Sequence, residues 1–242
     1  MLDKTRGIVL HHYKYGETSL ITHIFTRKLG RRSFLIKGAR SKRSRLKANI
    51  FQPLNILDLE FYHKENQELL LVKEASRAKA FNHFPFEVKK SSQAMFMAEV
   101  LHKCLIEEAP HVDLFDFLEN AIEYFDLMKV DSSNFHLAFL MKLTQYLGIL
   151  PPIREANGIK QLNIDSDDPR KPRRSVGASL QSGHSFLLYL LISESFEKCS
   201  LHSLSHTERN SILDEILAFY TDNGYKLDKL KSYPVLKTLF SE

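Results

Sequence analysis

The sequence predicts an α+β fold, and three observations lead to this prediction. Short runs rich in β-branched and aromatic residues fill the first part of the chain. From residue 85 onward, apolar residues recur at the helical period of 3.6. Residues 151–184 follow neither period and are rich in proline, glycine, serine and charge. We therefore expect a β domain over residues 1–80 and an α-helical domain over residues 81–242, with residues 151–184 as an irregular exposed insertion.

Five runs make up the expected β domain. TRGIVLHHYKYG and SLITHIFTRKLG end near Gly16 and Gly30, which suit turns, and RRSFLIKGAR follows directly. In NILDLEFYHK the residues Leu57, Leu59 and Phe61 alternate with polar neighbours, as a half-buried antiparallel strand requires. QELLLVKEASRAKAF completes the set. Five short strands in so few residues indicate a small closed or partly open barrel, of which the OB-fold is one common form.

Apolar stripes and end signals predict the helices. The first of three stripes before the LGILPP segment consists of Ala94, Ala98, Leu101 and Leu105. The third stripe should end at LGILPP, where Gly148 suits a helix C-terminus and two prolines forbid continuation. SHTE at 205–208 is a capping box that should open a helix running to about Asn223. The last element is expected to break near Pro234.

The composition is that of a globular protein. Hydrophobic residues make up 43% of the chain and charged residues 26%. No apolar run approaches the roughly 18 residues that a membrane span needs, so we expect no membrane association. Cys104 and Cys199 lie far apart and belong to no CxxC pair. They predict a reducing cytoplasmic setting in which both cysteines are small buried hydrophobes.

Positive charge is concentrated near the N-terminus. The first 50 residues carry 13 lysines and arginines against only Asp3 and Glu17, whereas the rest of the chain is acidic on balance. The densest part is KGARSKRSRLK, residues 37–47, with six basic residues in eleven. Such a run is often only a solvated loop. A chain with this asymmetry is also typical of a basic module that binds a polyanion.

Three features favour a phosphate-binding role for this run. It joins strands of the expected barrel, so a rigid scaffold displays it. Basic residues at the preceding hairpin add to the same field, and no acidic residue lies between Glu17 and Asp58. Gly38 lets the main chain approach a phosphate closely. Nearby aromatic residues that could stack on bases are Tyr13, Tyr15, Phe34, Phe51 and Tyr62.

The N-terminal part of the chain contains the TRGIVL strand, the YGE turn followed by SLI, the hairpin FTRKLG and the tetrapeptide KGAR. In this order these segments resemble the bacterial RecO family of DNA repair and recombination mediators. LGILPP resembles the family's Leu-Gly-x-x-Pro segment, and LDKLKSYPVLKTL resembles its C-terminal segment. The order and spacing of these segments extend the resemblance over the whole chain.

The resemblance implies an N-terminal OB-fold, a helical C-terminal domain and a bacterial cytoplasmic, nucleoid-associated protein. It implies binding to single- and double-stranded DNA and annealing of complementary strands without ATP. It also implies RecR and the C-terminal tail of the single-strand-binding protein SSB as partners, with RecA loaded indirectly. The family's basic segment falls on Lys37, Gly38 and Arg40, and charge and position extend it. The predicted DNA-binding residues are thus Arg6, Arg31, Arg32, Lys37, Gly38, Arg40, Lys42, Arg43 and Arg45.

The sequence departs from the family at its zinc motif. Many members carry four cysteines after the Leu-Gly-x-x-Pro segment, but residues 151–198 contain none. A structural zinc site needs four ligands, which His184 alone does not supply. We therefore expect no zinc site and no cofactor.

Other functions stay open from the residues alone. The main alternative is an RNA-binding OB module of translation or ribosome assembly. A second is a metal-dependent nuclease that uses the DSDDP loop at 165–169, although this loop lacks the glycine and glutamate of a calcium loop. A third is a purely structural adaptor. The sequence contains none of the common catalytic motifs HExxH, GxSxG, GxxxxGK or GxGxxG, so we expect no enzyme.

Overall fold

The computed structural model describes residues 1–41, 46–63, 67–156, 158–162 and 184–239. The chain forms two compact units, Met1–Leu127 and Met128–Glu242. The first unit contains the β domain and also two helices that the sequence assigns to the helical domain.

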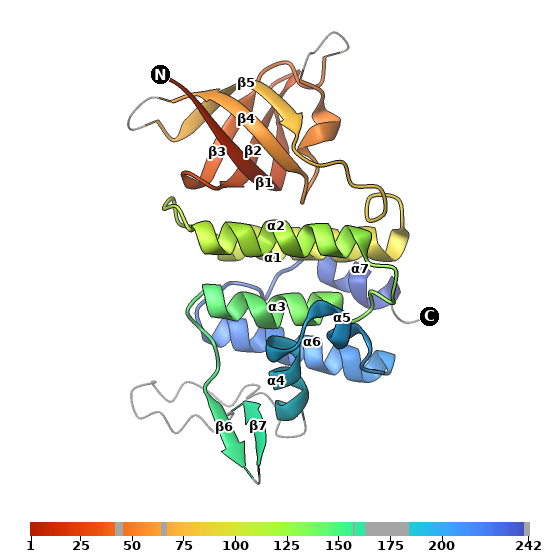
Figure 1. Ribbon diagram of the computed structural model, residues 1–242. Coiled ribbons are helices and arrows are strands. Elements are labelled where there is room, and N and C mark those ends of the chain that lie inside the picture. Colours follow the sequence, from red (N-terminus) through yellow and green to blue (C-terminus); the bar gives the residue numbers. More distant parts are fainter. Residues whose placement is uncertain (42–45, 64–66, 157, 163–183, 240–242) are drawn as a thin grey trace. The chain divides into compact units, whose positions relative to one another are not determined.

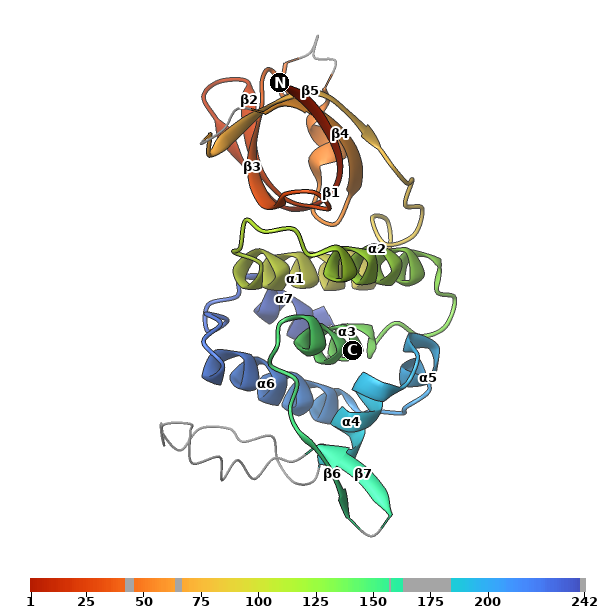
Figure 2. The ribbon, with the colours of Figure 1, turned by 60° about the vertical axis from the view of Figure 1, so that its left-hand side comes forward.

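Five strands form a closed barrel at the N-terminus (Figures 1 and 2). They are β1 (Leu2–Tyr15), β2 (Ser19–Thr26), β3 (Gly30–Ile36), β4 (Ile56–Tyr62) and β5 (Leu69–Arg77). Their order around the barrel is β1-β2-β3-β5-β4, in which β3 and β5 pair in parallel and every other pair is antiparallel. A short 3₁₀ helix, η1 (Ala48–Phe51), lies between β3 and β4. The predicted OB-like barrel is confirmed.

A bulge in β1 changes which residues face the barrel interior. Val9 belongs to the buried core and pairs with Ile24, but the next pair joins His11 to His23, so Leu10 is an extra residue on β1. Beyond this bulge the alternation is shifted by one position. His12 therefore pairs with the fully buried Thr22, whereas His11, Tyr13 and Tyr15 point outward.

The barrel core is apolar and closely packed. Phe34 and Phe61 meet edge to face with their ring centroids 5.3 Å apart, and Phe51 from η1 is fully buried beside them. The rest of the core comes from inward-facing residues of all five strands: Val9, Leu20, Ile24, Ile36, Leu57, Leu59, Leu70 and Val72. The inward alternation expected for β4 is thus present, with Leu57, Leu59 and Phe61 all buried.

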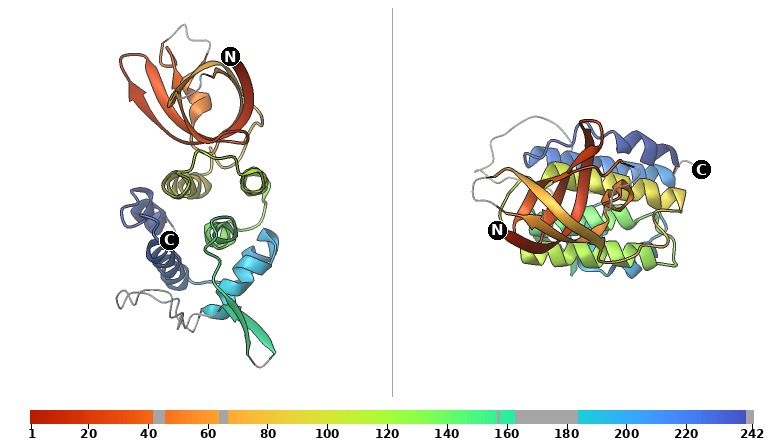
Figure 3. Two further views of the ribbon diagram at one scale, coloured as in Figure 1. Left: turned by 90° about the vertical axis from the view of Figure 1, so that its left-hand side faces the viewer. Right: turned by 90° about the horizontal axis from the view of Figure 1, so that it is seen from above.

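An antiparallel helix pair completes the first unit (Figure 3). The helices are α1 (Val88–Cys104) and α2 (Val112–Leu127). The buried carboxylate of Asp126 on α2 accepts hydrogen bonds from the main-chain N–H groups of Asn82, His83 and Phe84, at 3.0, 2.9 and 2.9 Å. These residues lead from the barrel into α1. One carboxylate therefore holds the connection between the barrel and its helices.

The second unit consists of helices and a hairpin (Figure 1). The helices are α3 (Phe135–Tyr146), α4 (Ser185–Ser193), α5 (Phe196–Ser200), α6 (His206–Asp222) and α7 (Ser232–Leu239). The Tyr220 hydroxyl on α6 donates to the Leu140 carbonyl on α3 at 2.7 Å. The buried Asn134 amide donates to the carbonyls of Cys199 and His202 and accepts from Arg209. These bonds join α3 to α5 and α6.

Three features of the second unit bear on what the sequence predicts: a capping box, an irregular insertion and a break near Pro234. The predicted capping box is confirmed, because the Ser205 and Glu208 side chains each bond to the other residue's main-chain N–H. Residues at the start of the expected irregular insertion instead form a hairpin of β6 (Ile153–Ala156) and β7 (Ile159–Leu162). Pro234 lies in the first turn of α7, where its missing N–H has no helical partner to lose, so the expected break there is wrong.

Across the described residues, no helix combines the length and hydrophobicity that crossing a bilayer requires.

Replacing Asp126 with alanine should destabilise the protein strongly. Three buried N–H groups would lose a charged acceptor, so we expect a loss of roughly 3 kcal/mol in the free energy of unfolding. Urea denaturation followed by circular dichroism measures this loss. The exposed Asp113 on the same helix is the matched control, and Asp113→Ala should cost less than about 1 kcal/mol. Equal losses in the two variants would show that the Asp126 bonds contribute little.

Two glycines with positive φ should respond differently to alanine. Gly30 has φ +64°, and a Cβ there would collide with the main chain of Ala109, whereas Gly38 has φ +66° and open space around it. Gly38→Ala should therefore cost only the backbone strain of about 1–2 kcal/mol. Gly30→Ala should cost at least about 2 kcal/mol more, because main-chain atoms must move. Thermal unfolding of both variants checks this, and similar midpoints would mean that the loop at Ala109 yields freely.

Candidate nucleic-acid interface

Three of the predicted DNA-binding arginines contact the helices of their own unit. Arg6 pairs with Asp58 on β4 and Glu119 on α2, each at 3.0 Å. Arg32 pairs with Glu108 in the loop after α1. Arg31 donates to the carbonyls of His102 and Leu105, both at 3.1 Å. These arginines hold the barrel on α1 and α2, a role that the sequence analysis did not assign to them.

The Arg31 contact satisfies the end of a helix. The last carbonyls of α1 have no partner within the helix. The half-buried Arg31 guanidinium supplies two of the missing hydrogen bonds, and the Arg31 main-chain N–H donates to the Glu107 carbonyl at 3.1 Å. A positive charge at a helix C-terminus is also favoured by the helix dipole. Arg31 is therefore committed to the fold and presents little of its charge to a ligand.

The KGAR turn lies at the opposite end of the barrel from these arginine contacts. It packs against the turn between β1 and β2. The Arg40 main-chain N–H donates to the Thr18 carbonyl at 2.8 Å, and its guanidinium lies 3.4 Å from the Gly16 carbonyl. The Gly38 N–H lies 3.4 Å from the Ser19 hydroxyl. Gly38 adopts a left-handed conformation that glycine accepts without strain. The two turns thus form one surface, and Lys42, Arg43 and Arg45 lie outside the described residues.

The charge of this surface is largely uncompensated. Lys14, Lys37 and Arg40 are exposed, and within the described part of the chain none of them forms an ion pair. Glu17 is the acidic residue of the adjoining turn. By contrast, Lys4 and Lys73 both pair with Glu60 on the outer face of β4. Phosphates gain most from cations that are not already neutralised.

The five aromatic residues that the sequence suggests for base stacking lie in different environments. Phe34 and Phe51 are buried in the barrel core. Tyr62 is exposed on β4, which also presents Asp58 and Glu60 on its outer face. Tyr13 and Tyr15 are exposed at the end of β1 that leads into the turn contacted by Arg40. Only these last two lie beside the basic surface.

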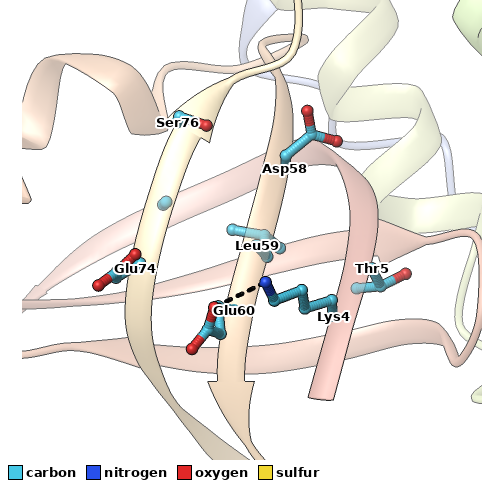
Figure 4. Close-up of a pocket in the computed structure, with 8 residues that line it drawn as sticks. Lys4, Thr5, Asp58, Leu59, Glu60, Glu74 and Ser76 are labelled. Atoms are coloured by element: carbon cyan, nitrogen blue, oxygen red, sulfur yellow. Dashed lines mark ion pairs between the residues drawn. The ribbon is translucent and has the colours of Figure 1, made fainter. Parts of the chain in front are cut away.

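The outer face of β1, β4 and β5 contains a shallow hollow with acidic character (Figure 4). Its lining residues are Lys4, Thr5, Asp58, Leu59, Glu60, Glu74, Ala75 and Ser76. The two hydrogen bonds that Glu60 accepts, from Lys73 and Lys4, keep its pKa below the usual value, so it remains ionised. Asp58 pairs with Arg6, and Glu60 pairs with Lys4 and Lys73, so the cations at this hollow are already neutralised. The hollow is therefore unsuited to a nucleic-acid backbone.

Three histidine rings stack beside Arg31. The His102 ring on α1 lies 4.9 Å from that of His11 and 5.1 Å from that of His23, with interplanar angles of 29° and 27°. Ser33 bonds to His23 Nδ1 at 3.0 Å. His11 and His12 are neighbours on β1 and lie on opposite faces, so only His11 joins the stack. His102 is distant in sequence, and no local pattern links it to the barrel.

None of the described residues forms a cluster suited to a metal ion. The histidine rings lie face to face, and no three histidine, cysteine or acidic side chains in the described ranges are placed to hold an ion. Cys104 and Cys199 are both buried and unpaired, as expected, and burial raises the pKa of Cys104 to about 12. The DSDDP loop considered for a nuclease lies outside the described residues.

The chain matches known proteins along its whole length. A family model described as recombination protein O N terminal matches residues 1–81, and one described as recombination protein O C terminal matches residues 85–234. The chain is 38% identical to the DNA repair protein RecO of Phocaeicola vulgatus, with 100% of both chains covered. It is 35% identical to the DNA repair protein RecO of Flavobacterium psychrophilum, again with 100% of both covered. The family resemblance of the sequence is confirmed.

The histidine stack should make stability depend on pH. Burial, followed by the charge of Arg31, lowers the pKa of His102 to about 4 from an ordinary 6.5. Below pH 6.5 the unfolded chain binds a proton that folded His102 does not, so stability is lost as pH falls toward 4. His102→Phe keeps a ring in the stack but removes the titration. It should make the loss shallower by up to about 1.4 kcal/mol per pH unit.

Urea denaturation at several pH values between 7 and about 4 measures this difference. Part of the slope should remain in the variant, because complete burial lowers the pKa of His136 to about 3. His83→Gln, at an exposed position outside the stack, is the control for replacing a histidine. An unchanged slope in His102→Phe would contradict the expectation.

Proposed function

The chain belongs to the recombination protein O family, and from this premise we propose that it binds single- and double-stranded DNA and anneals complementary strands without ATP. The family and the names of the relatives establish a role in DNA repair and recombination. The observation that carries the finer proposal is the exposed, unpaired positive charge where the KGAR turn meets the β1–β2 turn. The proposed role requires no covalent chemistry.

Phosphate binding at this surface follows from its charge and geometry. Lys37 and Arg40 are exposed on a turn that main-chain hydrogen bonds fix to the neighbouring hairpin. Binding a phosphate to such a cation releases condensed counterions, which favours association. Phosphate contacts carry no sequence information, so the surface would accept any strand. We include Lys42, Arg43 and Arg45 in the proposed surface by charge alone and omit Arg6, Arg31 and Arg32, whose side chains contact the helices.

Annealing needs two strands to approach each other. Their phosphates repel, and bound lysine and arginine side chains reduce this repulsion. Because the surface contacts phosphates and not the base edges, complementary bases remain free to pair. A protein that binds strands in this way speeds annealing without a nucleotide cofactor.

We also propose the partners that the family implies. These are RecR and the SSB tail, through which the protein would help to load RecA onto coated DNA at the bacterial nucleoid. A basic residue such as Lys142 on α3 would suit an acidic tail if its ammonium were free. Its ammonium instead donates to the carbonyls of Ile192, at 2.8 Å, and of Glu194, where α4 ends. We therefore assign the tail no residues.

The Lys37→Ala/Arg40→Ala double variant tests the phosphate-binding surface. It should weaken binding to single strands by roughly tenfold or more near 0.1 M salt. The dependence of log K on log salt should become shallower by about 1.4, because two phosphate contacts are lost. Fluorescence anisotropy with labelled oligonucleotides over a salt series measures both quantities.

Lys4→Ala/Lys73→Ala removes the same number of charges from the acidic side of the barrel and is the matched control. It should change affinity and salt slope much less. Annealing of SSB-coated complementary strands should slow in the Lys37/Arg40 variant and not in the control. Equal losses in both variants would show that only net charge matters. A wild type that prefers structured RNA to DNA would favour the RNA-binding alternative.

A further inference from the structure

Two tyrosines form an exposed aromatic strip on the barrel. Tyr13 and Tyr15 are 44% and 51% exposed. They are two positions apart on β1, beyond the bulge at Leu10, so both rings lie on the outer face. We call these two residues the tyrosine strip.

Apolar side chains lie beside the tyrosine strip on the outer face, and histidine rings border it at one end. Tyr13 pairs across the sheet with Ile21, which in turn pairs with Leu35, so both apolar side chains lie on the same outer face. The Tyr13 ring lies 5.8 Å from His23 and 6.5 Å from His11. These histidines stack on His102 of α1, which covers the face beyond them. The neighbouring rings limit the motion of Tyr13 and leave it partly open.

The other end of the strip meets the basic surface. Tyr15 directly precedes Gly16, whose carbonyl the Arg40 guanidinium approaches at 3.4 Å. Tyr15 pairs with Ser19, whose hydroxyl lies 3.4 Å from the Gly38 N–H beside Lys37. Exposed rings and unpaired cations therefore adjoin on one rigid sheet. This combination suits a ligand with alternating flat apolar groups and negative charges.

We propose that Tyr13 and Tyr15 are a stacking platform for the bases of a single DNA strand whose phosphates bind Lys37 and Arg40. The inference rests on the proposed function and adds to it a means of telling single strands from duplexes. Aromatic side chains stack on any base, because every base has a π face. In a duplex the bases already stack on one another and do not reach the rings. Bases stacked on the tyrosines would be unstacked from their neighbours in the strand. They would stay available until a complementary strand arrives.

Alanine variants of the strip test the proposal. Tyr13→Ala/Tyr15→Ala should weaken oligo(dT) binding about tenfold or more and change the affinity for a duplex of equal length by less than about twofold. The salt slope should stay at its wild-type value, because no cation is removed. Tyr13→Phe/Tyr15→Phe should restore oligo(dT) binding, which separates stacking from hydroxyl contacts.

Tyr62→Ala is the matched control. Tyr62 is 44% exposed, like Tyr13, but lies on the acidic side of the barrel with Asp58 and Glu60. This variant should bind oligo(dT) as the wild type does. Circular dichroism and thermal unfolding of each variant show whether the barrel remains folded. An equal loss in the Tyr62 variant would overturn the assignment to the strip.

A direct signal is available because the chain contains no tryptophan. Tyr13→Trp introduces a single fluorophore at the strip, and a stacked base should quench it when oligo(dT) binds. Duplex DNA of the same length should quench it much less. Wild-type protein that binds DNA, with neither quenching nor a loss in the alanine variant, would overturn the stacking platform alone. Wild-type protein that binds no DNA would instead overturn the proposed function.

Discussion

The docking of the barrel on α1 and α2 determines how the protein uses its positive charge. Arg6, Arg27 and Arg32 pair with Glu119, Asp116 and Glu108, and Arg31 bonds to the carbonyls that end α1. A single exposed ion pair contributes only about 0–1 kcal/mol. The Arg31 contact matters more, because unpaired helix carbonyls in a contact region would be costly. Among the cations in the described part of the barrel, Lys37 and Arg40 of the KGAR turn form no ion pair.

The bulge at Leu10 is the second constraint on the candidate surface. If β1 alternated regularly through Leu10, Tyr13 and Tyr15 would point into the barrel and His12 outward. With it, β1 contributes Val9 to the core before the bulge and an aromatic outer face after it. The same shift places His11 against His102, so the bulge also contributes to the contact with α1. One inserted residue therefore links barrel packing, helix docking and the exposed rings.

The two sides of the barrel differ in whether their cations are paired. The β1–β2 and KGAR turns present Lys14, Lys37 and Arg40, whereas the hollow on β4 and β5 presents carboxylates. A strand can release counterions at the first side, whereas the cations of the second side are already paired. Such a barrel defines where a nucleic acid lies without reading its sequence. The remaining helices and the β6–β7 hairpin form a separate compact unit with its own polar network around Asn134.

The sequence alone determined the barrel, the helices and the site of the basic run, because periodicity, turn glycines and charge are local properties. It predicted Leu57, Leu59 and Phe61 as buried and Ser205 and Glu208 as a cap, and both predictions are confirmed. It treated all N-terminal cations alike and gave no preference among five aromatic residues. Only the tertiary structure separates Arg31 from Arg40 and Tyr13 from Phe34. The reason is physical: the helix end that binds Arg31 lies more than 70 residues away in the chain, and a one-residue bulge, which no composition reveals, decides which face a ring occupies.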